Sequence, residues 1–116
     1  MTTATVMIRG KAYTTVAGRV AEAHAAGGFS MLGSSPLQVG DRHFVRVEIA
    51  VGELHFIGTS EIKFSAKPGT ADGDSPYECA ETSALGRALG FAGFGSAESI
   101  ASANEIARNS YGNSAR

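Results

Sequence analysis

Alternation of apolar and polar residues predicts three consecutive β-strands in the middle of the chain. The central strand spans Arg42–Val51, and its odd-numbered residues from Val45 onward are all β-branched and apolar. The flanking strands span roughly Phe29–Val39 and Leu54–Phe64. Turns at residues 40–41 and 52–53 connect them, and Gly52-Glu53 reads as a two-residue hairpin turn with glycine first. The three strands are therefore expected to form an antiparallel sheet.

A four-residue spacing of small residues predicts a long helix from Ser75 to Gly95. The residues on this spacing are alanines, with leucines beside them: Ala80, Ala84, Ala88 and Ala92, then Leu85 and Leu89. Ser75 and Glu78 have the spacing of a capping box, and Pro76 suits the first helical position. So narrow a stripe of small residues lets the helix lie close against a sheet or another helix. Arg87 is expected to emerge at the border of the packed face.

Shorter patterns complete the order of elements. Thr14 or Thr15 caps a helix that reaches about Ala26, and Thr2–Lys11 is a candidate extra edge strand. Residues 65–74 form a polar loop, and Ser102 with Glu105 signals a short last helix before a frayed tail at 109–116.

The predicted fold is α+β, in the order helix, three antiparallel strands, helix. Residues 1–95 form the domain, and residues 96–116 form a short helix and a flexible C-terminal tail. One face of the sheet packs on the helices, and the other is left to solvent, a ligand or a neighbouring subunit.

Composition narrows the class of protein. The chain has 116 residues and a net charge of −1, which is one domain's worth and gives no overall attraction to nucleic acid. Cys79 is the single cysteine, which excludes an internal disulfide and a cysteine-based zinc site. We find no signal peptide and no membrane-spanning segment, which fits a reducing cytoplasm and no membrane partner.

Cations gather on the face of the sheet opposite the apolar residues. The predicted register places Arg46 opposite Thr59 and Arg42 opposite Lys63, and Lys67 in the following loop extends the cluster. Bound phosphate would relieve the repulsion between two opposed cations. The alternative is a solvated face on which Glu48 and Glu61 are the partners of these cations; the two interpretations remain open.

Apolar residues on the first strand do not fit this face. The simplest register places Met31, Leu37 and Val39 outward. Either a bulge at Pro36 resets the alternation, or a neighbouring subunit covers these side chains.

Arg87 is the first candidate for a phosphate contact, because a guanidinium group matches phosphate oxygens in a bidentate manner. The alternative is a structural arginine paired with a carboxylate such as Glu81, or with a neighbouring subunit. Three aromatic side chains are candidates for base stacking or for ordinary packing: Tyr13, Phe44 and Tyr77.

The element order and one motif resemble single-strand annealing proteins of the Rad fifty-two type, including their phage-encoded relatives. In that family a three-stranded antiparallel sheet precedes a helix with the pattern T-x-x-L-x-R-A-L and a glycine shortly after. Residues Thr82–Leu89 match the pattern, with Gly93 and Gly95 beyond. Tyr13 ahead of a short helix is also similar. The position before the arginine is usually a cation in the family and is Gly86 here.

The resemblance implies a ring or helical homo-oligomer that binds the backbone of single-stranded DNA and anneals complementary strands without ATP. The expected nucleic-acid-binding residues are Arg42, Arg46, Lys63, Lys67 and Arg87. The alternative is a protein-interaction module on the same fold that does not bind DNA. An enzyme has the weakest support, because the sequence offers no acid/base pair, metal-ligand spacing, activated nucleophile or phosphate-binding loop; we expect no cofactor and no small-molecule substrate.

Overall fold

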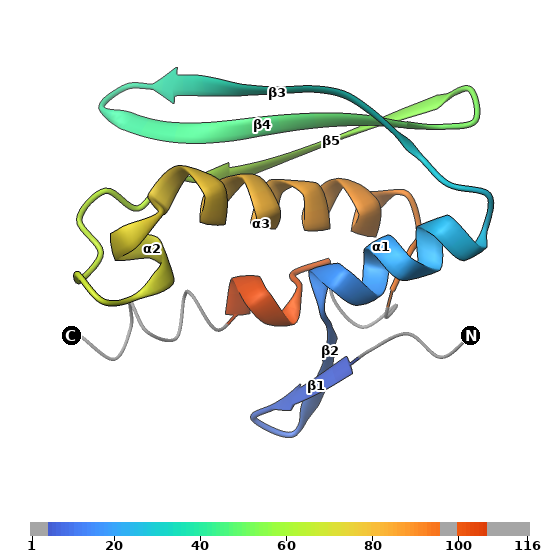
Figure 1. The fold of residues 1–116 in the computed structure, drawn as a ribbon, viewed down its shortest axis with the longest axis horizontal. Coiled ribbons are helices and arrows are strands. Elements are labelled where there is room, and N and C mark those ends of the chain that lie inside the picture. The colour runs from blue at the N-terminus through green and yellow to red at the C-terminus, as the bar shows by residue number, and fades with distance from the viewer. Residues whose placement is uncertain (1–4, 96–99, 107–116) are drawn as a thin grey trace.

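A computed structural model describes residues 5–95 and 100–106. Its main sheet is antiparallel and has the strand order β3 (Ser30–Val39), β4 (Arg42–Val51), β5 (Leu54–Glu61) (Figure 1). Val51 pairs with Leu54, as the hairpin turn predicts. The predicted α+β order of helix, three strands and helix is confirmed. The third strand ends at Glu61 and not at Phe64, so the expected pairing of Arg42 with Lys63 does not form.

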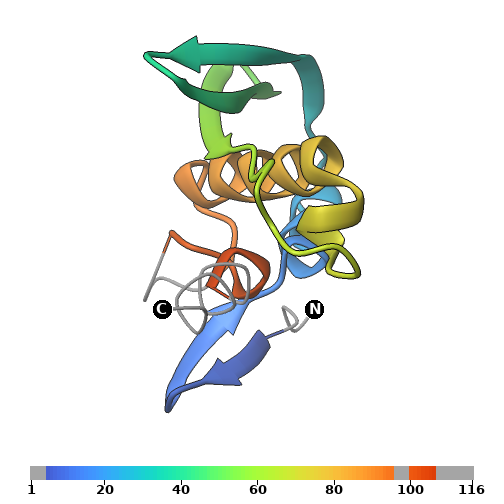
Figure 2. The ribbon, with the colours of Figure 1, turned by 90° about the vertical axis from the view of Figure 1, so that its left-hand side faces the viewer.

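The helices lie in two layers beneath one face of this sheet. Helix α3 (Pro76–Phe91) packs on β4 and β5, and α1 (Val16–Ala25) packs on the far side of α3 (Figures 1 and 2). The long helix is thus the middle layer and has neighbours on two sides. Its alanine stripe is buried as predicted at Ala80, Ala84 and Ala88, whereas Ala92, the fourth alanine of the stripe, is the C-cap of α3 and is only half-buried. The opposite face of the sheet carries no covering element among the described residues.

Gly58 on β5 sets the distance between α3 and the sheet. A Cβ atom at this position would lie 2.1 Å from the carbonyl oxygen of Ala84 and 2.6 Å from the backbone nitrogen of Ala88. Since backbone atoms cannot rotate aside, only glycine permits this approach. The buried residues between the two elements, Val45, Val47 and Ile49 on β4, form the centre of the core with the alanines of α3.

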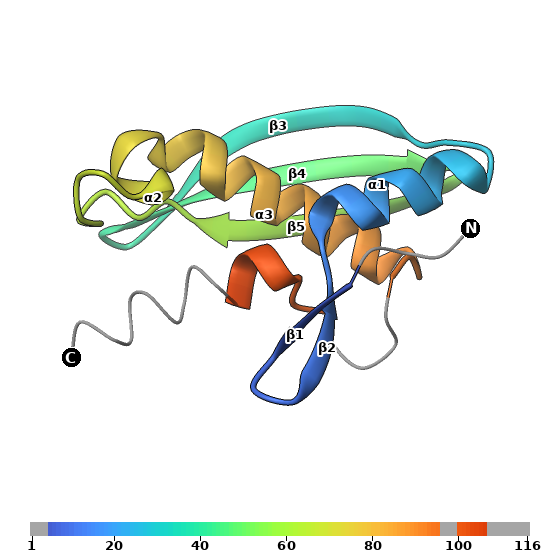
Figure 3. The same ribbon diagram turned by 60° about the horizontal axis from the view of Figure 1, so that its bottom comes forward.

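The N-terminal strand does not join the main sheet. β1 (Thr5–Ile8) pairs with β2 (Lys11–Thr14) in a separate hairpin that projects from the helical side (Figures 1 and 3). The reason lies in the two-residue turn between them, where Arg9 and Gly10 both have positive φ, at 53° and 79°. That geometry closes a tight hairpin and reverses the chain before it can reach the sheet. The expected strand within Thr2–Lys11 is therefore confirmed, but it is not an edge of the main sheet.

Helix caps are partly as predicted. Thr15 caps α1, and its Oγ1 accepts a hydrogen bond from the backbone N–H of Gly18 at 2.9 Å. The predicted capping box at Ser75 is wrong, because Ser75 makes no side-chain cap. The preceding loop instead contains the short helix α2 (Ala71–Asp74), capped by Thr70, and the N–H of Ser75 already bonds to Ala71 at 2.8 Å.

β3 extends beyond the helices and is exposed along all ten residues. Its register shifts between Met31 and Gly33, so the bulge lies near the start of the strand and not at Pro36. Met31 consequently pairs with Ile49 and shares the helix-facing side of the sheet, whereas Leu37 pairs with Phe44 on the opposite face. Val39 pairs with Arg42 and also faces away from the helices.

Residues 100–106 return to the body of the protein. Residues 103–106 are helical, and the predicted cap is present, since the Oγ of Ser102 accepts from the N–H of Glu105 at 3.2 Å. The side chain of Asn104 accepts from the N–H of Val16 at 3.0 Å, which ties this segment to the start of α1. The predicted tail at 109–116 lies outside the described residues. No helix in the described part of the chain is both long and apolar enough to span a membrane.

Candidate nucleic-acid interface

Three of the five predicted cations meet at the free edge of β5. A hollow of about 290 Å³ there is lined by Arg42, Phe44, Thr59, Ser60, Glu61, Lys63, Arg87 and Glu105. The side chains come from β4, β5, the loop after β5, α3 and the segment 100–106, so the cluster exists only in the folded chain. We refer to this hollow as the β5-edge pocket.

Each cation reaches the pocket for a local reason. Arg42 opens β4 directly after the Gly40-Asp41 turn, beside the end of β5. Lys63 follows β5 by two residues. Arg87 is brought to the edge by the close approach of α3, because a Cβ on Gly58 would lie only 3.1 Å from the Cβ of Arg87.

Arg42 is held by a carboxylate on the same face. Its Nε and Nη2 each donate to Glu61 at 2.8 Å, and its guanidinium lies 5.4 Å from the centre of the Phe44 ring. The hydrogen bonds and charge of Glu61 raise the pKa of the Arg42 guanidinium. The Arg42 side chain stays 62% exposed, so the pair remains open to solvent and to competition from a ligand.

Arg46 and Lys67 lie outside the β5-edge pocket. Arg46 is on the uncovered face of the sheet and pairs with Glu48 at 3.3 Å; Glu48 also contacts His55 at 3.0 Å. Lys67 lines an adjoining groove of about 1140 Å³ between the 62–72 segment and α3. The groove and the pocket share Arg42, Glu61 and Lys63, so Lys67 extends the same cationic lining.

Of the three cations in the pocket, Lys63 is the one whose charge is not balanced by an ion pair with a described carboxylate. No carboxylate of the described residues lies within ion-pair distance of its ammonium group. Its side chain is therefore available to an anion from solution.

Arg87 emerges at the border of the packed face, as predicted, with 32% of its side chain exposed. Its Nη1 lies 3.2 Å from Oε1 of Glu105, and its guanidinium carbon lies 5.6 Å from the centre of the Phe91 ring. The carboxylate named in the sequence-based alternative, Glu81, is not the partner, because it accepts from the hydroxyl of Ser34 at 2.5 Å. The Glu105 partner comes from a segment 18 residues away.

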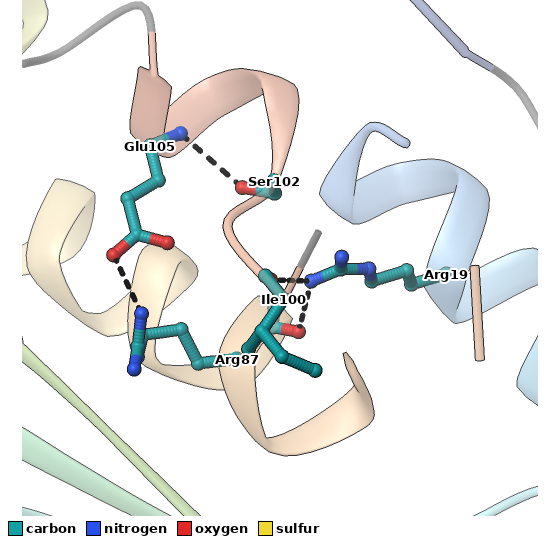
Figure 4. A network of polar contacts seen from close by, with 6 residues as sticks. Arg19, Arg87, Ile100, Ser102 and Glu105 are labelled. Carbon is teal, nitrogen blue, oxygen red and sulfur yellow. Dashed lines mark hydrogen bonds and ion pairs between the residues drawn. The ribbon is translucent and has the colours of Figure 1, made fainter. Parts of the chain in front are cut away.

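Arg19 is a structural residue that lies in α1 beneath the 100–106 segment. It is fully buried, and its Nη1 donates to the carbonyl oxygens of Gly86 at 2.8 Å and Ile100 at 2.7 Å (Figure 4). Burial lowers the pKa of the Arg19 guanidinium, and Glu105 and Glu22 oppose this effect while Arg87 adds to it. The signal was present: positions 16, 19, 20 and 23 share one helical face.

The three candidate stacking residues lie in different parts of the structure. Phe44 lines the β5-edge pocket, whereas Tyr77 is half-buried against the hydrophobic core. Tyr13 belongs to β2 in the N-terminal hairpin. Only Phe44 of the three lies beside the cations.

Comparisons of the chain with protein-family models, curated proteins and solved structures found no match. The resemblance to single-strand annealing proteins therefore stays a prediction, carried by the residues of this chain alone.

Proposed function

We propose that this protein is a non-enzymatic, single-stranded-DNA-binding and strand-annealing protein of the cytoplasm that acts as a homo-oligomer. The observation that supports the proposal best is the meeting of Arg42, Lys63 and Arg87 in the β5-edge pocket. These residues are separated in sequence, and the resemblance and the sheet register predict each of them as a nucleic-acid contact.

The pocket has the parts that a nucleic-acid backbone requires. Arginine and lysine side chains contact phosphates and release counterions, which supplies affinity without sequence preference. Lys67 continues the cationic lining along the adjoining groove. Phe44 offers an aromatic ring beside the cations, and an unpaired base can stack on such a ring whereas a base inside a duplex cannot. This combination favours a single strand over a duplex.

Fluorescence anisotropy with a labelled oligonucleotide tests the proposal. We expect binding that weakens with salt, and the logarithm of the binding constant should fall with the logarithm of salt by about 0.7 per neutralised phosphate. Lys63→Gln and Arg42→Gln should each weaken binding and reduce this slope. Arg9→Gln is the matched control, because Arg9 is exposed at the tip of the N-terminal hairpin and the charge change is the same.

Two results would contradict the site. One is absence of binding at low salt; the other is equal loss in Lys63→Gln and Arg9→Gln, which would mean that only net charge matters. If binding is found, annealing of two complementary labelled strands is the next measurement, and we expect it to proceed without ATP.

The oligomer in this proposal would use β3. Both faces of β3 are exposed, and it forms one edge of the sheet. It carries four exposed apolar side chains, an unusual density for a free surface: Met31, Leu32, Leu37 and Val39. Leu37→Glu should lower the molar mass measured by light scattering, while the same change at Leu54, an exposed residue on the other edge strand, should not.

A protein-interaction module without DNA binding is the second candidate. The observation that favours it is that carboxylates of the same chain balance the charge of three candidate cations. Ion pairs of this kind are formed by Arg42, Arg46 and Arg87. An oligomer that fails to bind single strands at low salt would decide for this candidate.

A further inference from the structure

Glu105 acts on two arginines of different character. Its Oε1 is 3.2 Å from Nη1 of Arg87 at the β5-edge pocket. Its charge also opposes the effect of burial on the pKa of the Arg19 guanidinium. Figure 4 shows the carboxylate reaching from the 100–106 segment toward Arg87, with Arg19 beneath the same segment.

The segment that carries Glu105 is fastened at both ends. The carbonyl oxygen of Ile100 accepts from Arg19, and Asn104 accepts from the N–H of Val16. Between them, the Ser102 hydroxyl caps the short helix by accepting from the N–H of Glu105. These contacts hold a carboxylate at the position where a phosphate would meet Arg87.

The Arg87–Glu105 pair is incompletely satisfied. The second carboxylate oxygen, Oε2, is buried and has no hydrogen-bond partner among the residues that the structure describes. One guanidinium nitrogen of Arg87 is engaged, where a phosphate oxyanion could engage two. A partly desolvated carboxylate lacking half of its partners is a poor competitor for an arginine.

We propose that residues 100–106 form an acidic latch, in which Glu105 occupies the phosphate position at Arg87 and single-stranded DNA displaces it. This inference rests on the proposed function and concerns the regulation of the same site. The latch lowers affinity for nucleic acid by the free energy of the ion pair that must be broken. It also shields Arg87 from other anions until a strand that contacts Arg42 and Lys63 is already in place.

A double-mutant cycle tests the latch. Glu105→Gln should strengthen binding of a labelled single strand by about fivefold, which corresponds to about 1 kcal/mol. The same change made in an Arg87→Gln background should give no gain. Glu53→Gln is the matched control, because it removes the same charge from an exposed residue. Glu53 lies in the β4–β5 turn, at the end of the sheet opposite the β5-edge pocket.

Thermal unfolding separates the latch from a purely structural role. Because Glu105 also compensates the buried Arg19, Glu105→Gln should lower the melting temperature while it tightens binding. A structural role alone would lower both stability and affinity, and would overturn the latch.

Asn104→Ala provides a second variant that changes no charge and only loosens the segment. It should also tighten binding, and unchanged or weaker binding would count against the latch.

The outcomes distinguish the latch from the proposed function. If the parent protein binds single strands and Glu105→Gln gives no more than the Glu53→Gln control, the latch is wrong and the function stands. If neither the parent nor Glu105→Gln binds at low salt, both are wrong. Binding by the parent that Glu105→Gln strengthens beyond the Glu53→Gln control would support both.

Discussion

Replacement of Gly58 by alanine tests whether α3 and the sheet meet as closely as the structure indicates. The added methyl group would lie 2.1 Å from the carbonyl oxygen of Ala84 and 2.6 Å from the backbone nitrogen of Ala88. Neither atom belongs to a side chain that can change rotamer. The helix must therefore move away from β5 by about 1.3 Å before the methyl group and the Ala84 oxygen reach an ordinary contact distance of 3.4 Å.

The cost of this displacement follows from what lies between the two elements. A gap of 0.5–1 Å forfeits roughly a quarter to a half of the dispersion energy across an interface. The interface here is fully buried on both sides, with Val47 on β4 and Ala84 on α3 at its centre. Together with the usual cost of overpacking, we expect Gly58→Ala to lower the free energy of unfolding by about 3 kcal/mol. The better strand propensity of alanine offsets less than about 1 kcal/mol of this.

Urea denaturation followed by circular dichroism measures the effect. Gly33→Ala is the matched control, because Gly33 also lies in a strand of the same sheet, has no positive φ, and has nothing within 4 Å of an added Cβ. A difference of less than about 0.5 kcal/mol between the two variants would refute the close contact. Since Gly58 also fixes the position of Arg87, Gly58→Ala should weaken DNA binding even where the protein remains folded.

Three further predictions concern the helices. Arg19→Met should destabilise the fold by about 3 kcal/mol in thermal or chemical unfolding, because the buried carbonyl oxygen of Gly86 and the partly buried one of Ile100 lose their donor; a change below 1 kcal/mol would contradict the burial of Arg19. Thr15→Ala should lower the free energy of unfolding by about 1 kcal/mol and Ser75→Ala by less than half as much, because only the Thr15 side chain makes a cap hydrogen bond. A larger loss for Ser75→Ala than for Thr15→Ala would instead support the predicted capping box at Ser75. Gly86→Ala should cost about 1–2 kcal/mol, because the new methyl group would lie 2.6 Å from Cγ2 of Val16, and an unchanged unfolding midpoint would argue against this packing.

The sheet was predictable because its signal is local. Alternation in Arg42–Val51 and a glycine-first turn specify β4 and its register with β5, and both are as expected. The alanine stripe of α3 was predictable for the same reason. The prediction of a capping box at Ser75 is wrong because two nearby residues can cap a helix, Thr70 and Ser75. The side chain of Thr70 makes the cap hydrogen bond, at the start of α2.

The contacts that define the site were not predictable in this way. Arg87 and Glu105 are 18 residues apart, and Arg19 and Ile100 are 81 apart, so no periodicity connects them. Arg19 is charged and lies in the short helix α1, where such a residue is usually exposed. Its burial depends on acceptors that two other segments supply. Pairing of Arg87 with Glu105 in preference to Glu81 likewise depends on how residues 100–106 return to α3.

The packing of α3 also explains most of the T-x-x-L-x-R-A-L motif without reference to function. Within T-x-x-L-x-R-A-L, a helix enclosed on two sides accounts for the residues that are buried or packed against the core, and contact with α1 accounts for Gly86. The residues of the first group are Ser83, Ala84, Leu85, Ala88 and Leu89. Any helix in this position would need small residues there, whatever the protein does.

Two motif residues remain that burial does not explain. Thr82 is exposed and lines the larger groove, and Arg87 is partly exposed and lines the β5-edge pocket. These two residues open onto the hollows that share Arg42, Glu61 and Lys63. An assay of the proposed function is therefore most informative when it perturbs Thr82 and Arg87 and leaves the alanines intact.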